Sequence, residues 1–229
     1  MKLYLHNQKR NRDIDEYIQK LHISPSEFDK LNMPQTNILL VGGGFSPIQP
    51  EFSKTLFHIT NIDFNPSALQ TDKLHQITGD FLTQDTDTDS FDEIWALYSL
   101  PLYAQQAASI YVFIAKSMLS LAPNGKLRVF PIEFNNDTKL VTRDAEWEIS
   151  TTDVTQTTIK FLDELKKIGV LIEIIPANIN NEQTVIVKVP GSSAEKSVLN
   201  DKMREVLRKQ AEEFSKLSKI QIMGENVES

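Results

Sequence analysis

The chain has 229 residues, of which 40% are apolar and 24% are charged, and its formal net charge is −7. This composition excludes collagen, low-complexity disorder and coiled-coil rods, and the negative charge disfavours nucleic acid as a partner. The sequence has no cysteine, no apolar run that could cross a bilayer and no signal-peptide core, so we expect a cytoplasmic protein without disulfides, sulfur-dependent zinc sites or membrane contact.

Residues 1–36 predict a short N-terminal helical extension. Apolar side chains recur at three- and four-residue steps between Asp13 and Leu21, which places them on one face of a helix. Ser24, Pro25 and Glu27 then match a capping box with proline at the first helical position, so we expect a second helix to begin there.

Residues 37–190 alternate between strand-like and helix-like segments, a pattern typical of an open α/β sheet. Residues 37–41 form a continuous apolar run, as in a strand covered on both faces. Further strand-like runs cover 57–63, 75–78, 93–99, 126–132, 170–176 and 184–189, and helix-like stretches cover 66–74, 102–121 and 157–168. Because no helix separates the last two strands, we expect a mostly parallel, Rossmann-like sheet that has helices on both faces and ends in an antiparallel hairpin.

Two segments leave alternatives open. Residues 133–156 are too polar for a core strand or helix, and they are either a cover over a substrate or a surface loop. In residues 191–229, Ser192 can cap a long helix with one apolar stripe, which either packs on the domain or forms the seam of a homodimer. The stripe consists of Leu199, Met203, Val206, Leu207, Phe214 and Leu217.

Polar and glycine residues follow three of the predicted strands. Gly42, Gly43 and Gly44 come directly after the first buried strand, where they allow a sharp turn and the close approach of a ligand. Asp63 ends the second strand and can accept both hydroxyls of a ribose, while Asp80 follows the third strand and can accept a hydrogen bond from an exocyclic amine. An N-cap for a following helix is the alternative role of Asp63.

The glycine segment does not fit a dinucleotide site. The fingerprint of such sites has glycine at the sixth position, and that position is Pro47 here. Proline has no amide hydrogen and cannot pack like glycine. A ligand without a pyrophosphate therefore fits better than NAD.

The ordered motifs resemble those of class I S-adenosylmethionine-dependent methyltransferases. The resemblance covers residues 37–190, about two thirds of the chain, and includes the glycine loop, Asp63, Asp80, and the segments 91–95 and 121–127. It implies a sheet of seven strands with the last one antiparallel, and S-adenosylmethionine as the cofactor. Two positions depart from the family pattern: Leu40 stands where many members have an acidic residue, and Ser46 replaces a frequent third glycine.

The resemblance also implies which residues bind the cofactor. Glycines of the loop approach its methionine and ribose parts, Asp63 holds the ribose hydroxyls and Phe64 flanks the adenine. Asp80 meets the adenine amine with Phe81 beside it, and residues at the end of strand four lie near the sulfonium. The full set is Gly42, Gly43, Gly44, Phe45, Asp63, Phe64, Asp80, Phe81, Leu97 and Tyr98.

The resemblance implies methyl transfer, and the acceptor is expected near residues 98–103. The family's amino-methylating nucleic-acid enzymes usually carry an Asn/Asp-Pro-Pro-aromatic motif there, and this chain does not. We therefore expect a small-molecule acceptor, with a protein side chain as the next choice. No residue identifies itself as a general base, so a methyltransferase-like binding protein without turnover is the alternative. No metal site is expected, because the acidic run 85–90 lacks the glycine and glutamate of a calcium loop.

Overall fold

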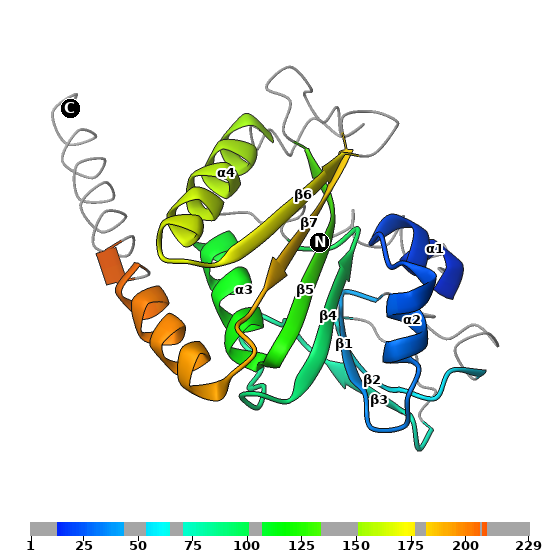
Figure 1. Cartoon of the computed structure of the whole chain (residues 1–229). Helices are drawn as coiled ribbons and strands as arrows, with labels where there is room; N and C mark the ends of the chain where they lie inside the picture. Colours follow the sequence, from blue (N-terminus) through cyan, green and yellow to red (C-terminus); the bar gives the residue numbers. More distant parts are fainter. Residues whose placement is uncertain are drawn as a thin grey trace, which may run out of the picture.

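Seven strands form one sheet in the order β3-β2-β1-β4-β5-β7-β6 (Figure 1). The computed structural model describes residues 13–43, 54–64, 71–100, 107–133, 151–176, 182–206 and 208–209. The strands are β1 Asn37–Val41, β2 His58–Asp63, β3 Leu74–Thr78, β4 Phe91–Leu97, β5 Leu121–Glu133, β6 Leu171–Pro176 and β7 Glu182–Lys188. Strands β1 to β5 pair in parallel, whereas β7 runs antiparallel to both β5 and β6. The predicted fold class, with its terminal hairpin, is confirmed.

Two short N-terminal helices cover one face of the sheet, α1 (Ile14–Lys20) and α2 (Pro25–Leu31) (Figure 1). The Ser24 side chain accepts from the backbone of Glu27, whose carboxylate accepts from the Ser24 amide, so the predicted capping box is confirmed. The helices and the loop between them share an apolar cluster with the sheet that includes Tyr17, Leu21, Ile38, Leu40, Phe57, Trp95 and Phe130.

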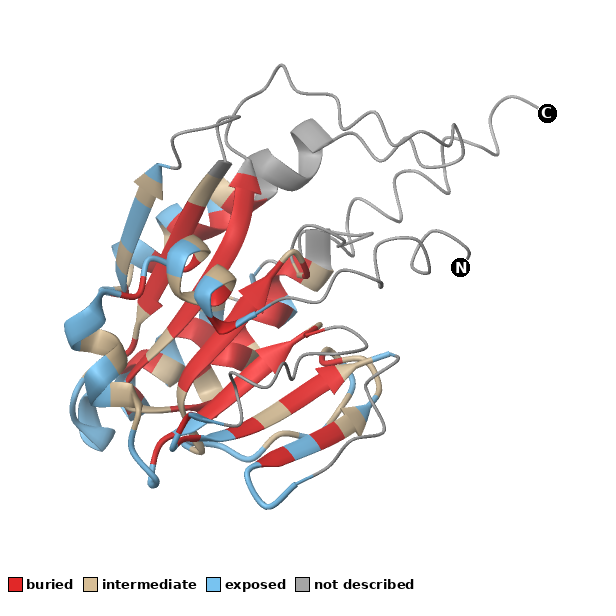
Figure 2. Cartoon of the chain, turned by 90° about the vertical axis from the view of Figure 1, so that its right-hand side faces the viewer, coloured by how far each residue is buried: buried red, intermediate tan, exposed pale blue. Residues whose placement is uncertain are grey.

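The opposite face carries α3 (Ala107–Ser120), α4 (Thr151–Lys167) and the helix of residues 193–206 (Figure 1). The Ser192 hydroxyl accepts from the amide of Glu195, which confirms the predicted cap. Leu199 and Met203 are buried in the core on this face, so the described part of the stripe packs on the domain. Figure 2 shows the central strands buried along most of their length, as expected between two helical layers.

A buried ion network attaches the N-terminal helices to the sheet. Arg128 on β5 is fully buried and donates to both carboxylate oxygens of Glu93 on β4, and to Glu27 on α2. Trp95 donates its indole N–H to the same Glu93. Burial lowers the pKa of Arg128, but Glu93 and Glu27 outweigh burial and hold that pKa above its ordinary value. The guanidinium also donates to the carbonyls of residues 21 and 22, just after α1.

Several predicted boundaries are wrong, and pairing in the sheet gives the reason. The predicted helix 66–74 does not reach its end, because residues 71–73 form a turn and Leu74 pairs with Ile59 in the ladder. Strand β5 begins at Leu121 and not at Lys126, since Leu121 already pairs with Phe91 before a shift of register. Helix α4 begins at residue 151, within the stretch predicted to be irregular, and β4 ends at residue 97.

Candidate cofactor site at the carboxyl edge

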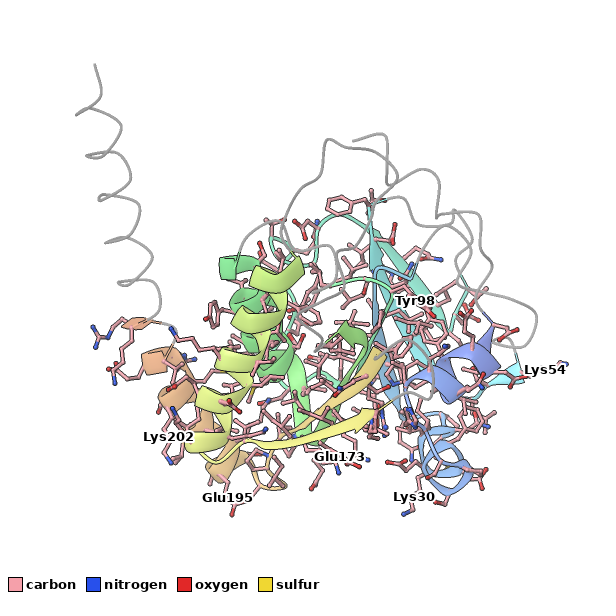
Figure 3. The ribbon with its side chains drawn as sticks, turned by 90° about the horizontal axis from the view of Figure 1, so that it is seen from above. Lys30, Lys54, Tyr98, Glu173, Glu195 and Lys202 are labelled. Atoms are coloured by element: carbon pink, nitrogen blue, oxygen red, sulfur yellow. The ribbon has the colours of Figure 1, made fainter. Side chains whose placement is uncertain are left out.

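The carboxyl ends of β1, β2, β3 and β4 lie along one edge of the sheet, because these strands pair in parallel. Backbone hydrogen bonds join their ends: the Gly42 amide donates to Ile62, and the Gly79 amide donates to Asp63. Figure 3 looks down on the molecule from this side and shows Tyr98 well inside the outline, whereas the labelled Lys30, Lys54, Glu173, Glu195 and Lys202 lie around it. Ligands of open α/β sheets bind at such an edge.

Gly42 makes the first turn after β1 in a backbone conformation that favours glycine. Its φ is +68°, in the left-handed region. A Cβ atom at this position would lie 2.6 Å from Cβ of Ser99, just after β4. Glycine is therefore required here by both the backbone and a neighbouring side chain.

Gly43 is fixed by a buried side chain of the next strand. Its amide donates to Oδ1 of Asn61 over 3.1 Å, and Nδ2 of Asn61 donates to Oε1 of Gln76 over 2.7 Å. Asn61 is fully buried and Gln76 is 7% exposed. The glycine turn thus lies at the end of a hydrogen-bonded row that runs through β2 into β3.

Asp63 and Phe64 follow one another at the end of β2. Asp63 is partly exposed, and its carbonyl accepts from Gly79 at the end of β3. Phe64 is 57% exposed. A large aromatic ring exposed beside a carboxylate is suited to contact a flat heterocycle.

Asp80 shapes the turn after β3. Its Oδ1 accepts from the amide of Leu82 over 2.9 Å, and its carbonyl accepts from the amides of Thr83 and Gln84. The Phe81 ring is 2% exposed and packs edge-on against Phe113 of α3. Phe81 therefore lies in the core below the edge, where its ring supports the turn.

Lys116 attaches this turn to α3. Its ammonium donates to the carbonyl of Gln84 and lies 5.0 Å from the centre of the Phe81 ring. Burial lowers the pKa of Lys116, although Asp85 and Asp80 act in the opposite direction. The turn that carries Asp80 is thus held from below by an aromatic ring and a lysine.

The end of β4 contributes Leu97, Tyr98 and Ser99. The Leu97 side chain is buried in the cluster beneath α1 and α2, so Leu97 can face a ligand only with its backbone. Tyr98 has a φ of +49°, its amide donates to Phe130, and its ring packs edge-on against Phe130. Positive φ is uncommon for a bulky residue, and such residues concentrate at functional sites.

The structure therefore brings eight of the ten predicted site residues to the carboxyl edge or directly beneath it. Gly44 and Phe45 lie outside the described residues, as do Ser46, Pro47 and the segment 134–150. Sequence reasoning missed Asn61 and Gln76. The available signal was a pair of carboxamides at positions of β2 and β3 that point to the same side as the apolar residues Ile59 and Leu74.

Other features do not compete with this edge as a cofactor site. A shallow cleft of about 360 Å³ opens at the opposite, amino ends of β2 and β3, where His58, Asp72 and His75 are among its lining residues. Within the described ranges, no group of three or more histidine or acidic side chains could hold a metal ion. Among the helices that the structure describes, none is long and apolar enough to cross a membrane.

No protein-family model and no curated protein matches the sequence. Solved structures do match the fold. One is a chain of the complex between the Haloferax volcanii Trm112 methyltransferase activator and a methyltransferase, with 13% identity and a TM-score of 0.52 over 77% of this chain and 91% of that chain. Another is phosphoethanolamine N-methyltransferase 2 of Haemonchus contortus in complex with S-adenosyl-L-methionine, with 11% identity and a TM-score of 0.54.

The alignment with the Haemonchus enzyme covers 77% of this chain but only 53% of that enzyme, so this chain spans about half of its length. A protein of Bordetella parapertussis, whose name gives no activity, matches with 13% identity and a TM-score of 0.51 over 82% of this chain and 77% of that chain. The strand order and these matches show that the chain has the Rossmann-like fold of class I S-adenosylmethionine-dependent methyltransferases.

Proposed function

We propose that this protein binds S-adenosylmethionine at the carboxyl edge of β1 to β4 and transfers its methyl group to a small-molecule acceptor. The observation that carries the proposal is the left-handed turn at Gly42, with Asp63 and Asp80 at the ends of the two strands beyond it. This arrangement offers a sharp glycine turn at one end and two carboxylates at the other.

The residues present fit the chemistry of this ligand. The ribose hydroxyls and the adenine amine are hydrogen-bond donors, and the carboxylates of Asp63 and Asp80 are acceptors. Phe64 exposes a ring for the adenine to pack against. At the other end, the left-handed turn at Gly42 closes against Ser99, so glycines and a small side chain line this end of the site.

The protein's part in the reaction is to align the two reactants. When bound, the cofactor would supply a methyl group activated by positive sulfur; the acceptor's lone pair would form the new bond, and the pair of the broken C–S bond would stay on sulfur. Alignment of this kind can contribute roughly 7–11 kcal/mol in favourable cases. The backbone at Leu97 and Tyr98 is the part of the described chain that we assign to the reacting end, with Tyr98 and Ser99 toward the acceptor.

Calorimetric titration with S-adenosylmethionine and S-adenosylhomocysteine tests the cofactor. We expect Asp63→Ala to weaken both affinities by about tenfold, or about 1.4 kcal/mol, without a change in the midpoint of urea unfolding. Asp72→Ala is the matched control, because Asp72 is exposed at the opposite end of the sheet. Unchanged affinity in Asp63→Ala would remove that carboxylate from the site, and binding of NADH instead of either sulfur ligand would overturn the proposal.

A binding protein without turnover is the alternative, and a specific observation favours it. Leu40 is fully buried in the apolar cluster under α1 and α2, where many class I members carry an acidic side chain. Incubation of the protein with methyl-labelled cofactor and cell extract separates the two. Label in the small-molecule fraction supports the proposed acceptor class, label in the protein fraction supports a protein acceptor, and no label with intact cofactor binding supports the alternative.

A further inference from the structure

Asn61 occupies a place beside Leu40 that connects the glycine turn to the interior of the sheet. In the sheet register Asn61 lies between Leu40 of β1 and Gln76 of β3. Directly paired residues of parallel strands point to the same face. The polar side chain that is absent at position 40 is therefore present one strand away, on the same face and under the same turn.

Both ends of the Asn61 carboxamide are used. Oδ1 accepts from the Gly43 amide and Nδ2 donates to Oε1 of Gln76. A buried carboxamide without partners is costly, so these bonds hold the side chain in one orientation. A Cβ at position 43 would overlap Oδ1 of Asn61. Glycine at position 43 thus leaves room for the asparagine oxygen, whereas glycine at position 42 leaves room for the Ser99 side chain.

Two buried polar atoms beside this row have no hydrogen-bond partner in the part of the chain that the structure describes. They are Nε2 of Gln76 and Oγ of Ser99. Buried donors and hydroxyls are nearly always paired in folded proteins, with protein, water or a ligand. The two atoms lie on opposite sides of the glycine turn. Their open hydrogen-bonding positions indicate that water or a polar ligand binds beside the turn.

We propose that Asn61 is a positioning residue for the methionine end of the cofactor. This inference rests on the proposed function. Asn61 takes the Gly43 amide out of ligand contact and fixes the turn, so that the amino-acid end of the cofactor meets a preformed backbone. Polar support for the turn thus comes from β2 in this chain, which explains how Leu40 is compatible with cofactor binding.

The test compares two ligands that differ only at the end in question. S-adenosylhomocysteine carries the amino and carboxylate groups, and 5′-methylthioadenosine lacks them. We expect Asn61→Leu to weaken S-adenosylhomocysteine by about tenfold and methylthioadenosine by less than about twofold. Ile59→Ala is the matched control, because Ile59 is buried on the same face of β2 and outside the Asn61–Gln76 row; it lowers stability and leaves both affinities unchanged.

A second measurement does not need a ligand. Hydrogen exchange of the Gly43 amide, read against the amides of β1, should be at least about tenfold faster in Asn61→Leu than in the wild type. If that variant does not fold, Gln76→Leu keeps the Gly43 bond but frees one end of Asn61, and it should show the same ligand selectivity with a smaller amplitude.

The outcomes separate the two proposals. If the wild type binds neither ligand, the proposed function fails, and the inference fails with it even if Gly43 exchange responds to Asn61. If the wild type binds both, the inference alone is overturned by unchanged selectivity, by equal loss of both ligands or by unchanged Gly43 exchange in the variant.

Discussion

One cross-strand row of the sheet contains two buried polar groupings, and they differ in how fully their hydrogen bonds are satisfied. The pairs of the register run from Gln76 and Asn61 through Leu40 and Trp95 to Arg128. At the Arg128 end, all three guanidinium nitrogens have protein partners. At the Gln76 end, Nε2 has no partner in the described part of the chain.

This difference separates a structural role from a ligand-facing one. The Arg128 network joins β4, β5 and the N-terminal helices, and its charges are matched within the protein. The Asn61–Gln76 pair instead reaches a glycine turn at a strand end, and one of its donors, Nε2 of Gln76, has no partner in the described part of the chain. Buried polar atoms are usually paired with protein, water or a ligand, which supports our proposal that the ligand lies toward the Asn61–Gln76 end of the row.

The largest effect is expected from Arg128→Met. Removal of one partner leaves the buried Glu93 carboxylate uncompensated, which costs about 3–5 kcal/mol of unfolding free energy. Urea unfolding measures this loss, and the double variant with Glu93→Gln should recover a large part of it. Arg204→Met, at an exposed pair with Asp201, should change stability by less than about 0.5 kcal/mol. A loss below about 1 kcal/mol in Arg128→Met would show that the network is not a structural anchor.

A smaller loss of stability, with a loss of binding, is expected from Gly42→Ala. The left-handed backbone costs a residue with a Cβ about 1–2 kcal/mol, and the new methyl also displaces Ser99. The matched control is Gly169→Ala, where φ is also positive (+99°) but a Cβ meets no atom within 4 Å. We expect both variants to lose stability and only Gly42→Ala to lose affinity for S-adenosylhomocysteine. Equal affinities of the two variants for S-adenosylhomocysteine would show that the turn at Gly42 does not contact the ligand.

The sequence predicted which residues meet at the carboxyl edge better than it predicted the side chains that hold them in place. Gly42, Asp63 and Asp80 each stand at or just after the end of a strand, and parallel pairing brings strand ends to one edge. That rule is independent of the details of packing. It was therefore sufficient to place these residues together. The resemblance implied that Phe81 lies beside the adenine, but it could not show that the ring turns into the core against Phe113.

The two buried polar groupings could not be predicted, because each depends on register between distant segments. Arg128 meets Glu93 only because β5 shifts its pairing with β4 after residue 121. Asn61 reaches Gly43 and Gln76 because three strands align at that level. The local sequence pattern shows a polar residue in an apolar strand, but it does not show which residue of the neighbouring strand is its hydrogen-bond partner.

A modest, pH-dependent effect is expected at the edge of the Arg128 network. Burial raises the pKa of Glu27, but hydrogen bonds and charge from Lys126, Ser24 and Arg128 outweigh it and hold that pKa well below its ordinary value. Glu27 therefore stabilises the fold above its unfolded pKa of about 4.3, and this contribution is lost as the pH falls further toward the folded value.

We therefore expect the unfolding free energy of Glu27→Gln to fall less steeply with decreasing pH than that of the wild type. Between pH 6 and pH 3 the wild type should lose more stability than the variant, by an amount on the order of 1 kcal/mol after allowance for solvent screening. Urea midpoints read from Trp95 fluorescence in a Trp147→Phe background measure the difference. Glu205→Gln, whose carboxylate pairs with Arg208 on the exposed C-terminal helix, should follow the wild type. If stability falls with pH in parallel for Glu27→Gln and the wild type, the ion network stabilises the fold through Glu93 and Arg128 alone.

The smallest effect on stability is expected from Phe64→Ala at the ligand edge. Its ring is 57% exposed, so truncation should change the unfolding free energy by less than about 0.5 kcal/mol. If the ring flanks the adenine, affinity for both S-adenosylhomocysteine and methylthioadenosine should fall by about three- to tenfold, since aromatic contact of this kind is worth about 0.5–1.5 kcal/mol. Val198→Ala, which removes a 56% exposed apolar side chain on the far helix, should alter neither. Because both ligands carry adenine, a loss confined to S-adenosylhomocysteine would exclude Phe64 as the adenine contact and move the ring toward the methionine end that we assign to Asn61 and Gly43.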